Sequence, residues 1–146
     1  MKWSAVFLLL LPLVSGCYLK PSASNSPLQS PDGVSVTLLG QDCEDHSGAD
    51  GDPISRDLGV KVRFDNRSEQ PLHVSEQSIV LAVDSSHGPI RGPSDLVVRP
   101  HDSAVVQLDF THHALCYTGH EFVIIWNDAL ALGDRPLRLA DLSLRP

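Results

Sequence analysis

Cysteine and histidine are the residue types of this 146-residue chain with the most chemistry to offer. Thiolates and imidazoles act as nucleophiles and bases, and both bind transition metals. None of the common catalytic signatures accompanies them: the sequence has no Gly-x-Ser-x-Gly, His-Glu-x-x-His, Cys-x-x-Cys or glycine-rich phosphate loop. We therefore predict that the protein is not an enzyme. Two groups of residues remain to be interpreted, the three cysteines Cys17, Cys43 and Cys116 and the four histidines His46, His112, His113 and His120.

The residues before Cys17 have the features of an export signal. Lys2 precedes an apolar run over residues 5–14 that only Pro12 interrupts. A membrane-spanning helix needs about 20 apolar residues, so this shorter run fits the core of a signal peptide. It ends in Val14-Ser15-Gly16-Cys17, which resembles the lipobox of bacterial lipoproteins. An ordinary signal peptide with a chance cysteine is the alternative.

The lipobox resemblance implies a covalent lipid anchor. Residues 1–16 would be removed, and Cys17 would receive a diacylglyceryl group and usually an acyl chain such as palmitate on its new amine. Two or more chains hold a protein stably on a membrane. Because Tyr18 rather than Asp follows Cys17, the Gram-negative sorting rule favours the outer membrane, if the organism has one.

Acylation of Cys17 leaves Cys43 and Cys116 as an even pair in an exported chain. Export compartments are oxidising, so we expect a disulfide between them. The two cysteines are 73 positions apart, and closing a loop of that length stabilises a fold by roughly 4 kcal/mol. Two buried free thiols are the alternative.

The expected bridge would gather polar side chains at one pole of the domain, because a disulfide holds its flanking segments together. Imidazole and carboxylate groups together suit zinc, copper or nickel. No family ligand spacing is met, so a solvated polar cluster is the favoured interpretation and no cofactor besides the lipid is expected. The candidate metal ligands are His46, His112, His113 and His120.

The charge of the mature chain restricts its partners. Removing residues 1–16 takes away one of the 11 basic residues, Lys2, and none of the 18 acidic ones, so the formal charge falls from −7 to −8. An acidic domain is repelled by phosphate backbones, which argues against nucleic-acid binding.

The remaining chain divides into a tether and one domain. Residues 17–33 contain Pro21, Pro27 and Pro31 among serines and read as a semi-extended tether. Residues 34–146 show apolar side chains at every second position, which predicts half-buried strands. The clearest runs are 34–38, 60–64, 104–110 and 122–126, with weaker ones at 72–74, 79–83, 96–98 and 137–144. Residues 128–132 could form a short turn.

About seven or eight short strands at this spacing predict an all-β antiparallel sandwich. The segment Asp65-Asn66-Arg67-Ser68-Glu69-Gln70-Pro71 at the end of a strand resembles the B–C corner of exported Ig-like domains. The later Pro100-His101-Asp102-Ser103, which leads into residues 104–110, resembles their later strand pair. The resemblance implies an Ig-like sandwich outside the antibody family, because Trp126 follows Cys116 instead of lying between the two cysteines. A small closed β-barrel is the alternative.

These observations predict a lipid-anchored lipoprotein of the bacterial cell envelope whose domain binds another protein or supports an envelope assembly. A periplasmic transition-metal-binding protein that uses the histidine-rich pole is the alternative.

Overall fold

The computed structural model describes residues 26–46, 55–83, 86–88, 90–91, 95–112 and 121–144. Within these residues the regular structure is β, apart from one short 3-10 helix, η1 (Glu76–Ser78). No helix in the described part of the chain is long and apolar enough to cross a membrane. The strands are β1 (Leu28–Gln29), β2 (Val34–His46), β3 (Ser55–Asn66), β4 (Leu72–Val74), β5 (Val80–Val83), β6 (Ser86–Gly88), β7 (Ile90–Arg91), β8 (Leu96–Val98), β9 (Asp102–His112), β10 (Phe122–Ile125), β11 (Leu130–Leu132), β12 (Arg135–Pro136) and β13 (Leu142–Leu144).

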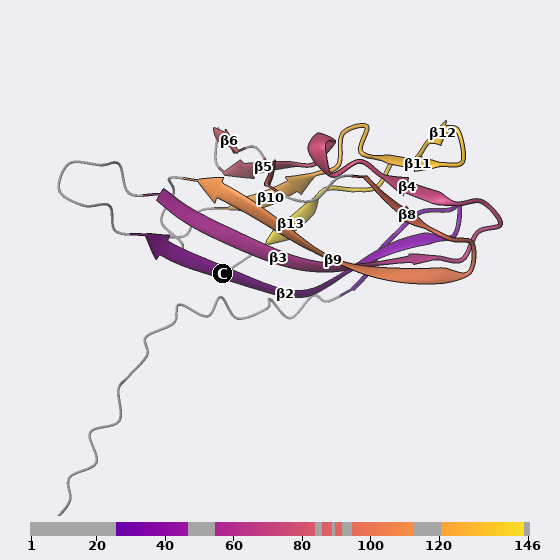
Figure 1. The fold of residues 1–146 in the computed structure, drawn as a ribbon, viewed down its shortest axis with the longest axis horizontal. Helices are drawn as coiled ribbons and strands as arrows, with labels where there is room; N and C mark the ends of the chain where they lie inside the picture. The colour runs from indigo at the N-terminus through magenta and orange to yellow at the C-terminus, as the bar shows by residue number, and fades with distance from the viewer. Residues whose placement is uncertain are drawn as a thin grey trace, which may run out of the picture.

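The first layer is a five-stranded antiparallel sheet in the order β1-β2-β3-β9-β7. Its three long strands, β2, β3 and β9, run the length of the molecule side by side (Figure 1). β3 lies in the middle and alternates Val60, Val62 and Phe64, all fully buried, with the exposed Lys61 and Arg63. This period of two places one face of the sheet against the core and the other in water.

The second layer consists of two four-stranded sheets, β13-β10-β5-β6 and β12-β11-β4-β8. Both lie on the same side of the long strands (Figure 1). The chain joins them three times within the described residues: β4 leads into β5 through η1, β10 leads into β11 through residues 126–129, and β12 leads into β13 through residues 137–141. The two sheets are therefore halves of one layer whose two central strands are interrupted.

A β-bulge in β2 decides which of its side chains reach the core. The register with β3 shifts between Leu38 and Gly40, so that Leu39 is the extra residue and is 43% exposed. Before the bulge the even-numbered Val34 and Val36 face inward; after it the odd-numbered Gln41 and Cys43 are buried instead. One extra residue reverses the alternation of a strand.

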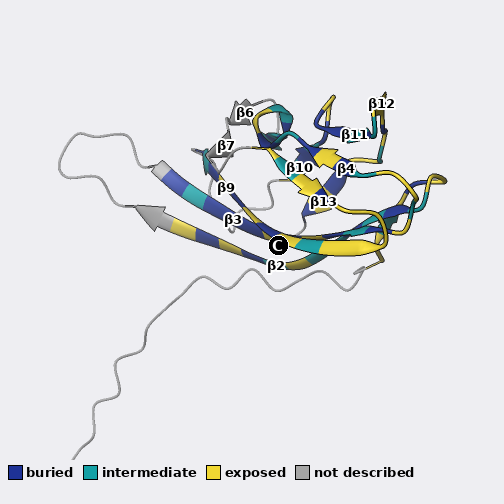
Figure 2. Ribbon diagram, turned by 45° about the vertical axis from the view of Figure 1, so that its right-hand side comes forward, coloured by how far each residue is buried: buried dark blue, intermediate teal, exposed yellow. Residues whose placement is uncertain are grey.

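The core fills the space between the layers, and buried segments of both line it (Figure 2). Trp126 is 1% exposed at the interruption of the second layer. Its ring meets Phe64 of the first layer edge-on, with the ring centres 5.9 Å apart, and its Nε1 donates to the Ala140 carbonyl at 3.0 Å. The indole thereby satisfies its one polar group while it joins the two layers.

The predicted all-β antiparallel sandwich is confirmed, and the sheets stay open at their edges instead of closing on themselves in the described part of the chain. Residues 72–74 and 96–98 are strands as expected, whereas 137–144 is a strand only at Leu142–Leu144. The described residues hold 13 strand segments, more than the expected seven or eight, because the short strands β1, β6, β7, β11 and β12 add to the expected ones. The expected turn at 128–132 becomes β11 after residue 129. The sheet also includes Leu28–Gln29, within the segment expected to be tether.

Candidate functional site

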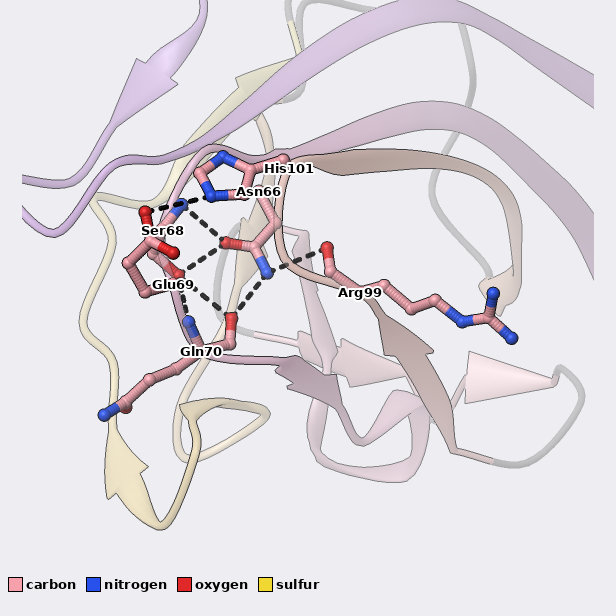
Figure 3. A network of polar contacts seen from close by, with 6 residues as sticks. All are labelled: Asn66, Ser68, Glu69, Gln70, Arg99 and His101. Carbon is pink, nitrogen blue, oxygen red and sulfur yellow. Dashed lines mark hydrogen bonds and ion pairs between the residues drawn. The ribbon is translucent and has the colours of Figure 1, made fainter.

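Asn66 anchors a corner of the first layer rather than a reactive site (Figure 3). Its side chain is 1% exposed, and its amide nitrogen donates to the carbonyls of Gln70, Val98 and Arg99 at 2.8, 3.1 and 3.2 Å. Its Oδ1 accepts from the backbone and the hydroxyl of Ser68 at 3.1 and 2.7 Å. The network ties the end of β3 to the turn before β9, so the corner expected at residues 65–71 has a structural role.

At the opposite end of the first layer, a cysteine and a histidine from non-adjacent strands meet inside the sandwich. Cys43 and His112 are 2% and 6% exposed, and Sγ lies 3.6 Å from Nε2. The His112 ring also contacts Phe122 edge-on, with centres 5.1 Å apart. Arg56, the register partner of His112, is likewise buried at 6% exposure. This end of the core is therefore polar.

The structure describes the histidine-rich pole only in part. His112 lies beside Cys43 as the expected gathering of the two flanks requires, whereas His113, His120 and Cys116 lie outside the described residues, as does the His46 side chain. Among the described residues, no group of three or more His, Cys, Asp or Glu side chains is arranged to hold a metal ion. The Cys43–Cys116 bridge and the metal site stay predictions, and Cys17 also lies outside the described part.

Acidic side chains follow the bulge on the outer face of the first layer. Asp42 and Glu44 are exposed there, and Asp109 of β9 lies on the same face. A Cβ atom on Gly59 of β3 would stand 2.5 Å from Oδ1 of Asp42, so the Asp42 carboxylate lies across the glycine backbone. This partial burial raises the pKa of Asp42, and the negative charges of Glu44 and Asp109 raise it further.

A groove of about 620 Å³ opens on the outer surface where the second layer is interrupted. Across the interruption the Ser75 backbone N–H donates to the Ala129 carbonyl at 2.7 Å. Asn127, which adopts a φ of 41°, adds a longer hydrogen bond from Nδ2 to the Ser78 carbonyl at 3.4 Å. Val80, Ile125 and Leu139 supply the apolar part of the lining. The polar part comes from Gln77, Ser78, Asn127, Asp128, Arg138 and Asp141. The lining of this groove, which we call the interruption groove, thus combines both signs of charge with an aliphatic surface.

Beside the groove, η1 turns a carboxyl group inward. Glu76 is 3% exposed, and its Oε2 has no hydrogen-bond partner among the described residues. Burial raises the pKa of Glu76, and the negative charge of Asp95 raises it further. A carboxylate left without a partner in the core destabilises the folded state when it is ionised.

Sequence reasoning did not find the interruption groove. Its residues are spread over three segments, 77–80, 125–128 and 138–141, with no common motif. The one local signal is Asn127-Asp128 directly after the apolar run that ends at Trp126, because Asn tolerates a left-handed backbone and marks turns.

Comparison with known proteins supports the fold. No protein-family model and no curated protein matches the chain. The crystal structure of YcdA from Bacillus subtilis, described provisionally as a lipoprotein, is similar with a TM-score of 0.60 and 16% identity over 81% of this chain. This chain spans 38% of that protein. A protein from Archaeoglobus fulgidus is more distant, with a TM-score of 0.40 and 10% identity over 75% of this chain and 98% of its own. The similarity to YcdA shows a shared fold.

Proposed function

We propose that this chain is an exported lipoprotein, anchored to the bacterial cell envelope through Cys17, whose sandwich domain binds another protein without turnover. The lipobox-like Val14-Ser15-Gly16-Cys17 at the end of an apolar run carries the proposal. The fold similarity to YcdA, itself described provisionally as a lipoprotein, supports it.

The surfaces of the domain favour binding as its activity. The outer face of the first layer is a broad sheet with exposed side chains such as Lys61, Val105 and Asp109. The second layer offers the interruption groove, which is open and mixed in chemistry. Surfaces of this kind suit protein recognition, and a tether raises the effective concentration of an anchored binder near its partner.

The anchor is tested by replacing the lipidated residue. Cys17→Ser should abolish incorporation of a labelled fatty acid and move the protein from the membrane fraction to soluble or unprocessed forms, because the thioether cannot form. Tyr18→Phe is the matched control and should leave both properties unchanged. Retention of Cys17→Ser in the membrane fraction with its label would refute the lipoprotein assignment.

Binding is tested separately, by photo-crosslinking in intact envelopes with a photoreactive residue at Gln77 or at Val105. Gln77 lines the interruption groove, and Val105 is 52% exposed on the outer face of the first layer. A defined crosslinked product from either position is expected. If neither position gives one, the protein-binding function is wrong.

A further inference from the structure

We propose that the interruption groove binds a short extended segment of the protein partner that carries an aliphatic side chain next to a lysine or arginine. This inference rests on the proposed protein-binding function and goes beyond it by naming the surface and the chemistry of the partner. It is carried by three properties of the groove: its aliphatic floor, its unpaired charges and its carboxamides.

The floor of the groove is apolar where the outer side of a sheet is usually polar. Val80 of β5 and Ile125 of β10 face each other in register and are half-buried, and both alternate with core residues. Leu139 adds a third aliphatic side chain. The outer face of the first layer, with exposed Lys61 and Arg63, is the contrasting case. A recessed aliphatic floor with a polar rim favours an apolar group of a ligand.

The rim has an excess of negative charge. Asp128, Arg138 and Asp141 are exposed and line the same groove, yet none of them forms an ion pair in the described structure. The carboxylates of Asp128 and Asp141 outnumber the guanidinium of Arg138, so the groove attracts a cationic side chain of the partner. Arg138 can donate hydrogen bonds to a carboxylate or carbonyl oxygen of the same segment. The formal charge of the whole chain, −7, steers cationic partners in the same direction.

Carboxamides complete the match to a peptide. Gln77 and Asn127 line the groove, and each offers both a donor and an acceptor to a peptide backbone. The volume of about 620 Å³ falls in the range of pockets that hold small ligands and short segments. Since no aromatic ring is among the lining residues described, the groove lacks the stacking surface that would favour a sugar or nucleobase.

The chemistry is tested on the soluble mature chain, residues 17–146 with Cys17→Ser, by NMR titration with two end-blocked peptides. One contains Leu-Lys-Leu-Lys between glycine and serine residues, and the other has Glu in place of both Lys. We expect saturable shifts at Ile125 and Asn127 with the lysine peptide, and at least tenfold weaker binding of the glutamate peptide. Absence of groove shifts at millimolar lysine peptide, or equal binding of both peptides, would overturn the inference.

Charge variants supply the matched comparison. Asp128→Asn combined with Asp141→Asn should weaken the binding of the lysine peptide at least tenfold, because both exposed carboxylates line the groove. Asp134→Asn, an exposed acid outside the lining, should leave the affinity unchanged. If Asp134→Asn weakened peptide binding as much as the double variant, the effect would come from the net charge of the protein, and the assignment to the groove would be wrong.

The crosslinking experiment separates this inference from the proposed function. A product from Gln77 that disappears in the Asp128→Asn, Asp141→Asn variant supports the groove. A product from Val105 alone keeps the protein-binding function and refutes the groove as its site. No product from either position refutes both.

Discussion

Sγ of Cys43 lies 3.6 Å from Nε2 of His112, although β3 separates the strands that carry them. Both side chains point into the sandwich from the same face of the first layer, where they are buried. The contact places His112, four positions before Cys116 in the sequence, beside Cys43 in space. The predicted bridge needs the two segments to lie close together in this way, and it stays a prediction.

The first prediction concerns that bridge. Cys43→Ala and Cys116→Ala should each lower the free energy of unfolding by up to about 4 kcal/mol, because either change opens the same long loop. The double variant should lose little more free energy of unfolding than either single variant. Urea unfolding under non-reducing conditions and peptide mapping measure this. Additive losses, or two free thiols in freshly exported protein, would contradict the bridge.

The second prediction concerns the bulge at Leu39. Inserting one alanine after Gly40 would reverse the alternation beyond the bulge and turn Asp42 and Glu44 toward the core, with Cys43 outward. Burying unpaired carboxylates costs several kcal/mol, so the insertion should lower the free energy of unfolding by more than about 4 kcal/mol or prevent folding. Leu39→Ser keeps the residue count and should change stability by less than about 1 kcal/mol. Similar losses for the two variants in urea unfolding would show that the strand tolerates an extra residue beyond the bulge and that its register is not fixed there.

The third prediction concerns the corner around Asn66. Asn66→Asp keeps the acceptor toward Ser68 but removes the amide donor that three carbonyls share. We expect a loss of about 2 to 4 kcal/mol in the free energy of unfolding, because an unsatisfied buried group costs about 1 to 3 kcal/mol. Ser68→Ala, which removes only a hydroxyl, should cost about 1 kcal/mol. If Asn66→Asp lowered the free energy of unfolding no more than Ser68→Ala, the amide donor of Asn66 would not be what stabilises the corner.

The fourth prediction is a pH dependence from Glu76. Its pKa is raised in the folded state by burial and by Asp95, so the folded protein holds this proton more tightly than the unfolded chain does. Stability should therefore fall as the pH rises from the ordinary pKa of a glutamate to the raised one, and stay lower above it. Glu76→Gln should remove the fall and stabilise the protein at neutral pH by on the order of 1 kcal/mol. Thermal unfolding between pH 4 and 8 measures this.

The control for this pH dependence is Asp95→Asn. It removes the second cause of the shift and leaves burial, so it should reduce the fall in stability without abolishing it. A Glu76→Gln variant with an unchanged pH profile would assign the dependence to other groups.

Local pattern determined the class of this fold. Alternation in segments such as 60–64 and 104–110 reports which face of a strand is buried, and burial is the dominant local constraint on a sheet, so the sandwich was predictable. The corner at residues 65–71 was recognisable for a similar reason, because Asn66 and Ser68, two positions apart, form a turn through hydrogen bonds between near neighbours. The motif at residues 14–17, on which the proposed export and lipid anchor rest, is likewise local.

Tertiary structure decided what depends on pairing between distant segments. The alternation of residues 34–38, continued along the strand, would bury Asp42 and expose Cys43; only the register with β3 shows that Leu39 is the extra residue and reverses the two. The interruption groove depends on η1, residues 126–129 and residues 138–141 meeting at one level of the second layer. No segment contains that information by itself, because the contact energies that align the segments exist only after the sheets have paired.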